Sequence, residues 1–182
     1  PASNRVTQQG SSTKLDTLGD RLMSWLQYSN VGGTESLWVS RSVVAGSSGG
    51  IRWMEIRGMK TTPTVYQQGT YAPDAKYRWM PSLAVDKLGN MAVGYSISSS
   101  TMYPAIGYAG RLVGDALGTL GQTETVLYSG TGAQTSYNRW GDYASMAVDP
   151  DGCTFWFTTE YLAATGTNWQ TRIGSFKFPG CQ

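Results

Sequence analysis

Two acidic side chains that could act as a catalytic pair stand in the C-terminal part of the chain. Asp142 lies within the segment Arg139-Trp140-Gly141-Asp142-Tyr143, and Glu160 lies in the next apolar segment. A glycosidase needs two carboxyl groups at one cleft, and their separation decides whether the sugar configuration is retained or inverted. We expect Asp142 and Glu160 on neighbouring strands of one sheet, where the two groups could approach each other. The alternative is structural: Asp142 accepts hydrogen bonds from a turn, and Glu160 pairs with an arginine.

Three arginines recur at intervals of about 60 residues, a period typical of propeller and solenoid repeats: Arg21, Arg78 and Arg139. The segments 78–86 and 139–149 both begin with Arg-Trp and end with Ala-Val-Asp, and Arg21 begins a fainter copy. A second motif, a valine followed four residues later by a glycine, precedes each copy, at 6–10, 65–69 and 126–130. Two motifs that keep one period argue against a chance alignment.

The equivalent positions of these arginines suggest a shared function. If the repeats surround one axis, the side chains of Arg21, Arg78 and Arg139 would meet at one mouth. Three guanidinium groups there would bind a carboxylate, because arginine offers planar, bidentate donors and stays charged. The alternative is that each arginine bonds to a neighbouring repeat or to a carboxylate such as Asp142, and so connects the repeats.

The seven tryptophans divide into two kinds. Trp79 and Trp140 occupy the same place in two repeats, which favours packing between repeats over ligand binding. Trp169 follows the polar segment 165–168 and is expected to be exposed, where it could stack on a sugar or on a partner.

The composition indicates an all-β domain. The chain has 182 residues with 23 Gly and 22 aromatic side chains but only 26 charged ones, a profile typical of many short strands joined by turns. No long helical period is present, and no apolar run reaches membrane-spanning length. The net charge is +2 without a cluster of lysines or arginines, so nucleic acid is not an expected partner.

The absence of histidine restricts the chemistry. A Ser-His-Asp triad and a histidine-based zinc site are excluded within this chain, and we expect no cofactor. Asp149 and Asp151 could contact calcium, but turn formation explains both, so no metal site is expected. Cys153 and Cys181 are expected to form a disulfide, as an even cysteine count favours in a secreted protein.

The expected elements form three units of four antiparallel strands, at about 20–70, 77–130 and 138–182. In the first unit, strands are expected over 21–28, 34–45, 51–57 and 64–69, with a tight turn over 30–33. The segment 51–57 alternates strictly, with Ile51, Trp53, Glu55 and Arg57 on one face. The third unit lacks a fourth strand, and the segment 3–10 is of fourth-strand type, so we expect it to complete that unit. The sequence therefore predicts one β-propeller segment of about three blades. Propellers contain four to eight blades. Half of a six-bladed ring is expected, and the partner is a second copy or the remaining blades of a parent protein.

The two hairpins 84–93 and 147–156 resemble the first hairpin of sialidase-like β-propeller blades. The segments 139–143, 155–161 and 173–181 together resemble the C-terminal blades of large secreted bacterial propeller proteins of undefined activity. A complete Asp-box, Ser-x-Asp-x-Gly-x-Thr-Trp, is absent. The resemblance implies a secreted module with a ligand-binding role, with glycan as one ligand class, or an assembly role.

The same resemblance implies two alternatives. One is a glycoside hydrolase of sialidase type, in which Tyr143 or Tyr161 would be the nucleophile beside Asp142 and Glu160. Three arginines bind the acid group of the sugar in such enzymes, although Arg21, Arg78 and Arg139 do not map onto that triad one by one. The other alternative is a purely structural piece of a larger exported protein.

Overall fold

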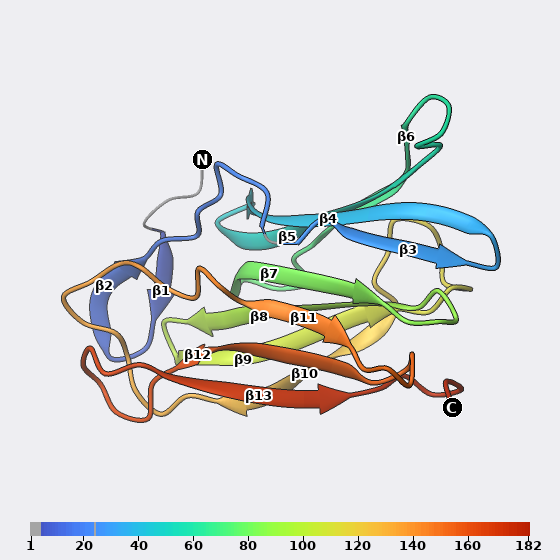
Figure 1. Ribbon diagram of the computed structural model, residues 1–182. Coiled ribbons are helices and arrows are strands. Elements are labelled where there is room, and N and C mark those ends of the chain that lie inside the picture. The colour runs from blue at the N-terminus through green and yellow to red at the C-terminus, as the bar shows by residue number, and fades with distance from the viewer. Residues whose placement is uncertain (1–4, 24) are drawn as a thin grey trace.

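The computed structural model describes residues 5–23 and 25–182, which form strands and loops without a helix. Four antiparallel sheets are present (Figure 1), and none closes on itself. We refer to the three larger ones as sheets 1, 2 and 3. Sheet 1 contains β3 (Gln27–Val31), β4 (Thr34–Ala45), β5 (Ser48–Arg57) and β6 (Thr64–Tyr71). Sheet 2 contains β7 (Tyr77–Val85), β8 (Met91–Ser99), β9 (Met102–Arg111) and β10 (Gln122–Ser129). Sheet 3 contains β11 (Ser145–Val148), β12 (Phe155–Tyr161) and β13 (Gln170–Phe176). A small fourth sheet contains β1 (Val6–Gln8) and β2 (Ser11–Leu15).

The prediction of an all-β chain of antiparallel sheets is confirmed. The strands of sheet 1 pair in chain order, and so do those of sheets 2 and 3, because short turns join consecutive strands. The described residues contain no helix of the length and apolar character that a membrane span requires.

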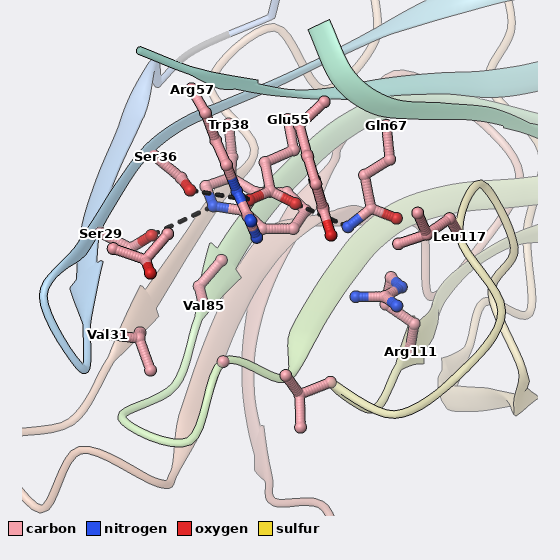
Figure 2. Close-up of a pocket in the computed structure, with 14 residues that line it drawn as sticks. Ser29, Val31, Ser36, Trp38, Glu55, Arg57, Gln67, Val85, Arg111 and Leu117 are labelled. Carbon is pink, nitrogen blue, oxygen red and sulfur yellow. Dashed lines mark hydrogen bonds and ion pairs between the residues drawn. The ribbon is translucent and has the colours of Figure 1, made fainter. Parts of the chain in front are cut away.

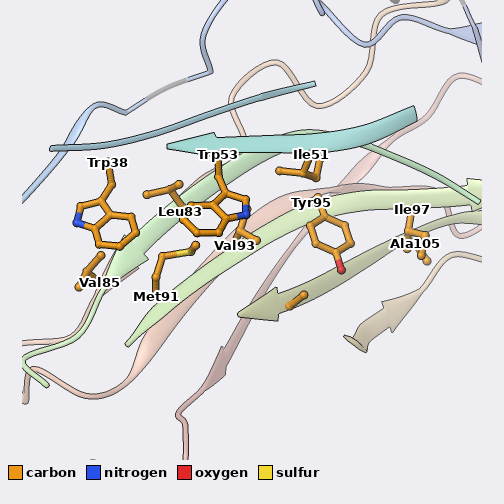
Figure 3. Packing of buried hydrophobic residues seen from close by; sticks show 11 residues of the cluster. Trp38, Ile51, Trp53, Leu83, Val85, Met91, Val93, Tyr95, Ile97 and Ala105 are labelled. Carbon is orange, nitrogen blue, oxygen red and sulfur yellow. The ribbon is translucent and has the colours of Figure 1, made fainter. Parts of the chain in front are cut away.

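Sheet 2 is the middle layer, and sheet 1 packs on one of its faces. Alternate side chains of β4 and β5 point toward sheet 2, and a polar pocket lies at one end of this interface (Figure 2). The apolar part contains Trp38 and Trp53, whose rings stack with centroids 6.2 Å apart. Leu83, Val93 and Tyr95 of sheet 2 pack into the same core (Figure 3). The strict alternation of β5 predicted this inward face.

Sheet 3 packs on the other face of sheet 2 through aromatic side chains. Phe155, Phe157 and Phe178 are buried there with Met146. Gly94 of β8 makes room for this layer, because a Cβ atom at that position would lie 2.5 Å from the ring of Phe157. A larger residue at Gly94 would push the two sheets apart.

The internal repeat extends to the backbone. Met80 and Gly141, which follow the two repeated Arg-Trp pairs, both have left-handed backbones, with φ of 51° and 60°. The preceding Trp79 and Trp140 are buried and contact each other, with centroids 6.0 Å apart. The structure therefore confirms that this tryptophan pair packs between the repeats, as expected. A buried methionine held at positive φ indicates that its surroundings impose this conformation.

The faint first copy of the repeat differs from the other two. The sequence predicted a strand over 21–28, but residues 19–26 are irregular where described, and β3 begins at Gln27. The sequence also predicted a tight turn over 30–33, and the turn between β3 and β4 consists of Gly32 and Gly33.

The N-terminal strand does not complete sheet 3 within this chain. Residues 3 and 4 of the expected strand lie outside the described residues, and Val6 pairs with Leu15 of β2 instead. Both side chains are buried against Trp79 and Trp140. The Gln8 side chain also exchanges two hydrogen bonds of 2.8 Å with the backbone of Gln134. These contacts bury a local hairpin, so the strand needs no partner in sheet 3, and β13 is left as an edge strand.

The disulfide between Cys153 and Cys181 is confirmed. It joins the hairpin turn before β12 to the C-terminal segment, and both residues are buried. Lys87 of the corresponding hairpin in sheet 2 lies beside this bond. Its backbone N–H donates to the carbonyl of Gly152 at 2.8 Å, and its Nζ donates to the carbonyl of Gln182 at 2.7 Å. The C-terminus is therefore held to sheet 2 as well as to sheet 3.

Candidate functional site

A cavity of about 440 Å3 lies at the end of sheet 3 where β12 ends and β11 and β13 begin. It contains five of the residues singled out from the sequence, brought together from two loops and one strand. The residues are Arg139, Asp142, Tyr143, Glu160 and Trp169. Their convergence makes this cavity the candidate site, which we call the sheet 3 cavity.

The two acidic groups of the sheet 3 cavity have unsatisfied oxygens. Oε1 of Glu160 and Oδ1 of Asp142 are each buried without a hydrogen-bond partner in the described residues. The other oxygen of Asp142 is ion-paired with Arg139. Burial raises the pKa of Glu160 above its ordinary value, although the backbone N–H of Gly141 donates to its carboxyl group and opposes the shift. Both residues line the cavity, but these two oxygens are themselves shielded from solvent, so a ligand hydroxyl would satisfy them only after a side-chain rotation.

Two aromatic side chains of the sheet 3 cavity are exposed. Trp169 is 57% exposed and Tyr143 is 93% exposed. Large aromatic side chains that face water at a cavity cost hydrophobic free energy unless a ligand or partner covers them. The exposure of Trp169 agrees with its place in a polar loop, whereas the buried Trp140 forms the floor of the cavity.

The three repeated arginines lie in three different surroundings. Arg139 lines the sheet 3 cavity and pairs with Asp142, the partner that the alternative named, but this pair lies within one repeat and connects no two repeats. Arg21 is exposed and pairs with the adjacent Asp20. Arg78 is completely buried beside sheet 1. The structure therefore does not arrange the three guanidinium groups as one open carboxylate site.

Arg78 holds sheet 2 together. Its Nε and Nη2 donate to the two carboxylate oxygens of Glu124, at 2.6 and 2.7 Å, and its Nη1 donates to Asp74 at 2.8 Å. Because β7 and β10 are the two edge strands of sheet 2, the ion pair with Glu124 crosses the whole sheet. The hydroxyl of Tyr95, on β8, donates to the same carboxylate at 2.6 Å. With its donors engaged in this way, Arg78 is a structural residue.

The remaining acidic candidates have local partners. The carboxylate of Asp151 accepts hydrogen bonds from the backbone of Cys153 and Thr154, which lower its pKa to about 2. Asp149 accepts hydrogen bonds from the backbone of Asp151 and from the indole of Trp156. These hydrogen bonds stabilise the turn before β12, which is the role that the sequence predicted for both residues. The residues that the structure describes contain no group of three acidic or cysteine side chains suited to a metal ion.

Other residues of the sheet 3 cavity escaped prediction. Thr158 and Thr171 line it from β12 and β13, and Thr159 has a buried hydroxyl without a partner. Threonine also occurs in strands outside the cavity, such as β4, β6 and β10, so the residue type alone did not indicate a site. The expected pairing of β12 with β13 could have pointed to Thr171, because it stands directly opposite Glu160.

Replacing Glu160 with glutamine is expected to stabilise the protein at pH 7 by about 1 kcal/mol, the cost of a buried group that lacks a partner. A carboxyl group with a raised pKa binds its proton more tightly in the folded state. Ionisation of Glu160 therefore lowers the free energy of unfolding. This loss is absent below the ordinary pKa near 4.5 and grows as the pH rises through the folded pKa. Urea denaturation at pH 7 and pH 4 would measure a difference that disappears at pH 4.

Glu35 provides the control for this measurement. Its carboxylate is ion-paired with Lys60 at the surface, and this contact lowers its pKa. Glu35→Gln should therefore give no gain at pH 7. A Glu160→Gln protein less stable than the wild type at pH 7 would contradict the assignment of a costly buried carboxyl group.

Comparison of the chain with protein-family models, curated proteins and solved structures gave no match.

Proposed function

We propose that the protein is a secreted, sialidase-like β-propeller module that binds a glycan in the sheet 3 cavity. The observation that carries this proposal is that exposed aromatic rings and two acidic residues, each with an unsatisfied oxygen, line one cavity of about 440 Å3. Sugars present apolar faces that stack on aromatic rings and hydroxyl groups that donate to carboxyl oxygens. Trp169 would provide the stacking surface, and the carboxyl groups of Asp142 and Glu160 would accept hydrogen bonds from the sugar hydroxyls.

The proposed assembly is a half ring of three blades, which a second copy or further blades of a parent protein would complete. Both outer sheets have apolar side chains on their open faces. On sheet 1 a row of four paired residues crosses all four strands: Tyr28, Leu37, Ile56 and Val65. On sheet 3, Trp156 and Ile173 are exposed. Propeller blades cover such faces by packing on one another.

Secretion is part of the same proposal. A disulfide persists in oxidising compartments and is uncommon in the cytosol, and the bond between Cys153 and Cys181 is buried within the fold.

Replacing Trp169 with alanine is expected to weaken glycan binding about 5- to 150-fold, because stacking on an aromatic ring contributes about 1 to 3 kcal/mol in comparable sites. The ligand would first be found on a glycan array that contains neutral and acidic sugars. Its affinity for the wild type and the variant would then be measured by calorimetry.

Trp156→Ala provides the matched control. Trp156 is also exposed and lies on the same sheet, but it stands at the opposite end of β12 and is outside the cavity. The control should keep the wild-type affinity. An equal loss of glycan affinity in both variants, or no binding to any glycan, would overturn the proposal. A purely structural role would then remain.

Glycoside hydrolysis is the second candidate function. The observation that favours it is the raised pKa of Glu160 beside Asp142, since a glycosidase needs one carboxyl group that stays protonated to act as the acid. Chromatography of each bound glycan after incubation separates the two functions. Cleavage that disappears in Glu160→Gln would establish hydrolysis, whereas an intact glycan would leave binding alone.

A further inference from the structure

A second cavity, of about 190 Å3, lies between sheets 1 and 2 at the end of the strands opposite to the sheet 3 cavity. We call it the sheet 1–2 pocket. In Figure 1 it is on the side where β3 turns into β4, whereas β13 begins on the side of β1 and β2. Its charged lining consists of Glu55, Arg57 and Arg111. An inference from this pocket is independent of the glycan proposal, because none of its lining residues contributes to the sheet 3 cavity.

Glu55 is fully occupied by neighbours on its own sheet. Its Oε1 accepts hydrogen bonds from the hydroxyl of Ser36 at 2.7 Å and from Nε of Arg57 at 2.5 Å. Its Oε2 accepts one from the amide of Gln67 at 2.6 Å. Arg57 in turn lies 3.5 Å above the ring of Tyr66. The carboxylate of Glu55 is therefore neutralised on the sheet 1 side of the pocket.

Arg111 is a buried cation without a carboxylate partner. Its exposed fraction is 2%, and within the part of the chain that the structure describes no carboxylate lies at ion-pair distance from it. Nη2 donates to the backbone carbonyl of Asp115 at 2.8 Å, and Nε is buried with no partner. The carboxylate of Asp115 instead accepts hydrogen bonds from the backbone of Leu112 and the amide of Gln122. A buried, unpaired charge is costly, so this arrangement calls for an anion.

The position of Arg111 directs it into the pocket. Figure 2 shows the side chain reaching inward from the end of β9, on the side opposite to Arg57 and Trp38. The exposed side chains of Val113 and Leu117 form an apolar rim, and Trp38 and Val85 form an apolar wall. The pocket therefore combines the Arg111 guanidinium with an apolar wall and rim, while its sheet 1 side carries further polar groups such as Ser36 and Gln67.

We propose that the sheet 1–2 pocket binds a small organic carboxylate. Its carboxylate pairs with Arg111, whose guanidinium can donate two parallel hydrogen bonds to such a group. Its apolar part lies against Trp38 and Val85, beneath Val113 and Leu117. The volume of about 190 Å3 limits the ligand to a molecule of about the size of butyrate or benzoate.

The pKa of Arg111 agrees with this assignment. Burial lowers it, and the charge of Arg57 lowers it further, while Asp115 and Glu55 oppose the shift through the longer-range attraction of their charges. A bound carboxylate would supply the close negative charge that the described residues do not provide.

The test is a titration of the full chain with sodium acetate, butyrate and benzoate, with sodium chloride at matched ionic strength. Tryptophan fluorescence follows the pocket through Trp38, and NMR follows the Nε–H resonance of Arg111. Butyrate or benzoate should bind saturably, with one dissociation constant from both signals. Chloride should produce no saturable change, and acetate should bind more weakly because it leaves the apolar wall uncovered.

Variants separate binding by Arg111 from general charge effects. Arg111→Gln should weaken binding at least tenfold without lowering the melting temperature, since it removes a buried charge that lacks a partner. Arg111→Lys keeps the charge but not the planar donors, so it should also bind the acid at least tenfold more weakly. This variant tests the proposal if Arg111→Gln does not fold. Arg172→Gln, at an exposed arginine of sheet 3, should bind like the wild type. Unchanged affinity in the Arg111 variants, or no saturable response to any of the acids, would overturn the proposal.

Discussion

Replacing Arg78 with methionine is expected to lower the free energy of unfolding by about 3 to 5 kcal/mol, the usual effect of removing one partner of a buried ion pair. The side chain of Arg78 is completely buried, and that of Glu124 is 17% exposed. Burial by itself raises the pKa of Glu124, but the hydrogen bonds from Arg78 and Tyr95 outweigh it, so the pKa lies below its ordinary value. Without Arg78 the carboxylate would remain between the sheets with one donor, Tyr95.

Denaturation by guanidinium chloride at pH 7 and at low pH would test this prediction. A carboxyl group with a lowered pKa contributes stability above its ordinary pKa, and that contribution is lost as the pH falls through the folded pKa. The difference between wild type and Arg78→Met should therefore shrink as the medium becomes acidic.

Arg21→Met is the matched control for Arg78→Met, because the sequence gives both arginines the same repeat position. Arg21 is exposed, and among the residues that the structure describes its side chain pairs with the adjacent Asp20, so its loss should change stability very little. Similar results for Arg78→Met and Arg21→Met would contradict the role assigned to the ion pair across sheet 2.

Removing the disulfide with the double substitution Cys153→Ser and Cys181→Ser is expected to lower the free energy of unfolding by about 3 to 4 kcal/mol. The bond closes a loop with a sequence separation of 28 residues and so restricts the unfolded chain. The loss also releases the segment after β13, which places Phe178 in the core between sheets 2 and 3. Thermal and chemical denaturation would measure the change.

Reduction of the wild-type protein provides an independent control, because it breaks the same bond without introducing serines into a buried position. Reduced wild type and the double variant should have similar stability. A double variant as stable as the oxidised wild type would show that the C-terminal segment is held by its other contacts, such as those of Lys87.

The strands could be predicted where side chains alternate and turns have clear residue types. The segment 34–45 was expected as a strand with these bounds, and it forms β4. In β5 the expected alternation of Ile51, Trp53 and Glu55 on one face is present. These predictions succeed because alternation and turn residues are local properties of the chain.

The N-terminal strand could not be placed from the sequence, because its pairing depends on distant contacts. Its resemblance to the segment 65–69 suggested the edge of sheet 3, whereas burial of Val6 and Leu15 against Trp79 and Trp140 favours a separate hairpin.

Residue type also failed to distinguish the repeated arginines. Arg78 lies between packed sheets and Arg139 lies at a cavity, although the two occupy one repeat position.

The candidate site was predictable in part. Asp142, Glu160 and Trp169 were chosen for their chemistry, and the structure brings them together. Their proximity follows from the pairing of β11 and β13 with β12 and from the loops at that end of sheet 3. Arg111 carried no sequence signal, because a buried arginine is recognised only from its surroundings.

The N-terminal hairpin has a consequence for the order in which the chain folds during synthesis. Val6 and Leu15 leave the ribosome well before Trp140 and Gln134, which cover and bind this hairpin. The backbone N–H of Asp16 likewise donates to the carbonyl of Asn138. Sheets 1 and 2 have only local pairings and can form as they emerge. The hairpin is therefore synthesised before sheets 1 and 2 but reaches its final position after them.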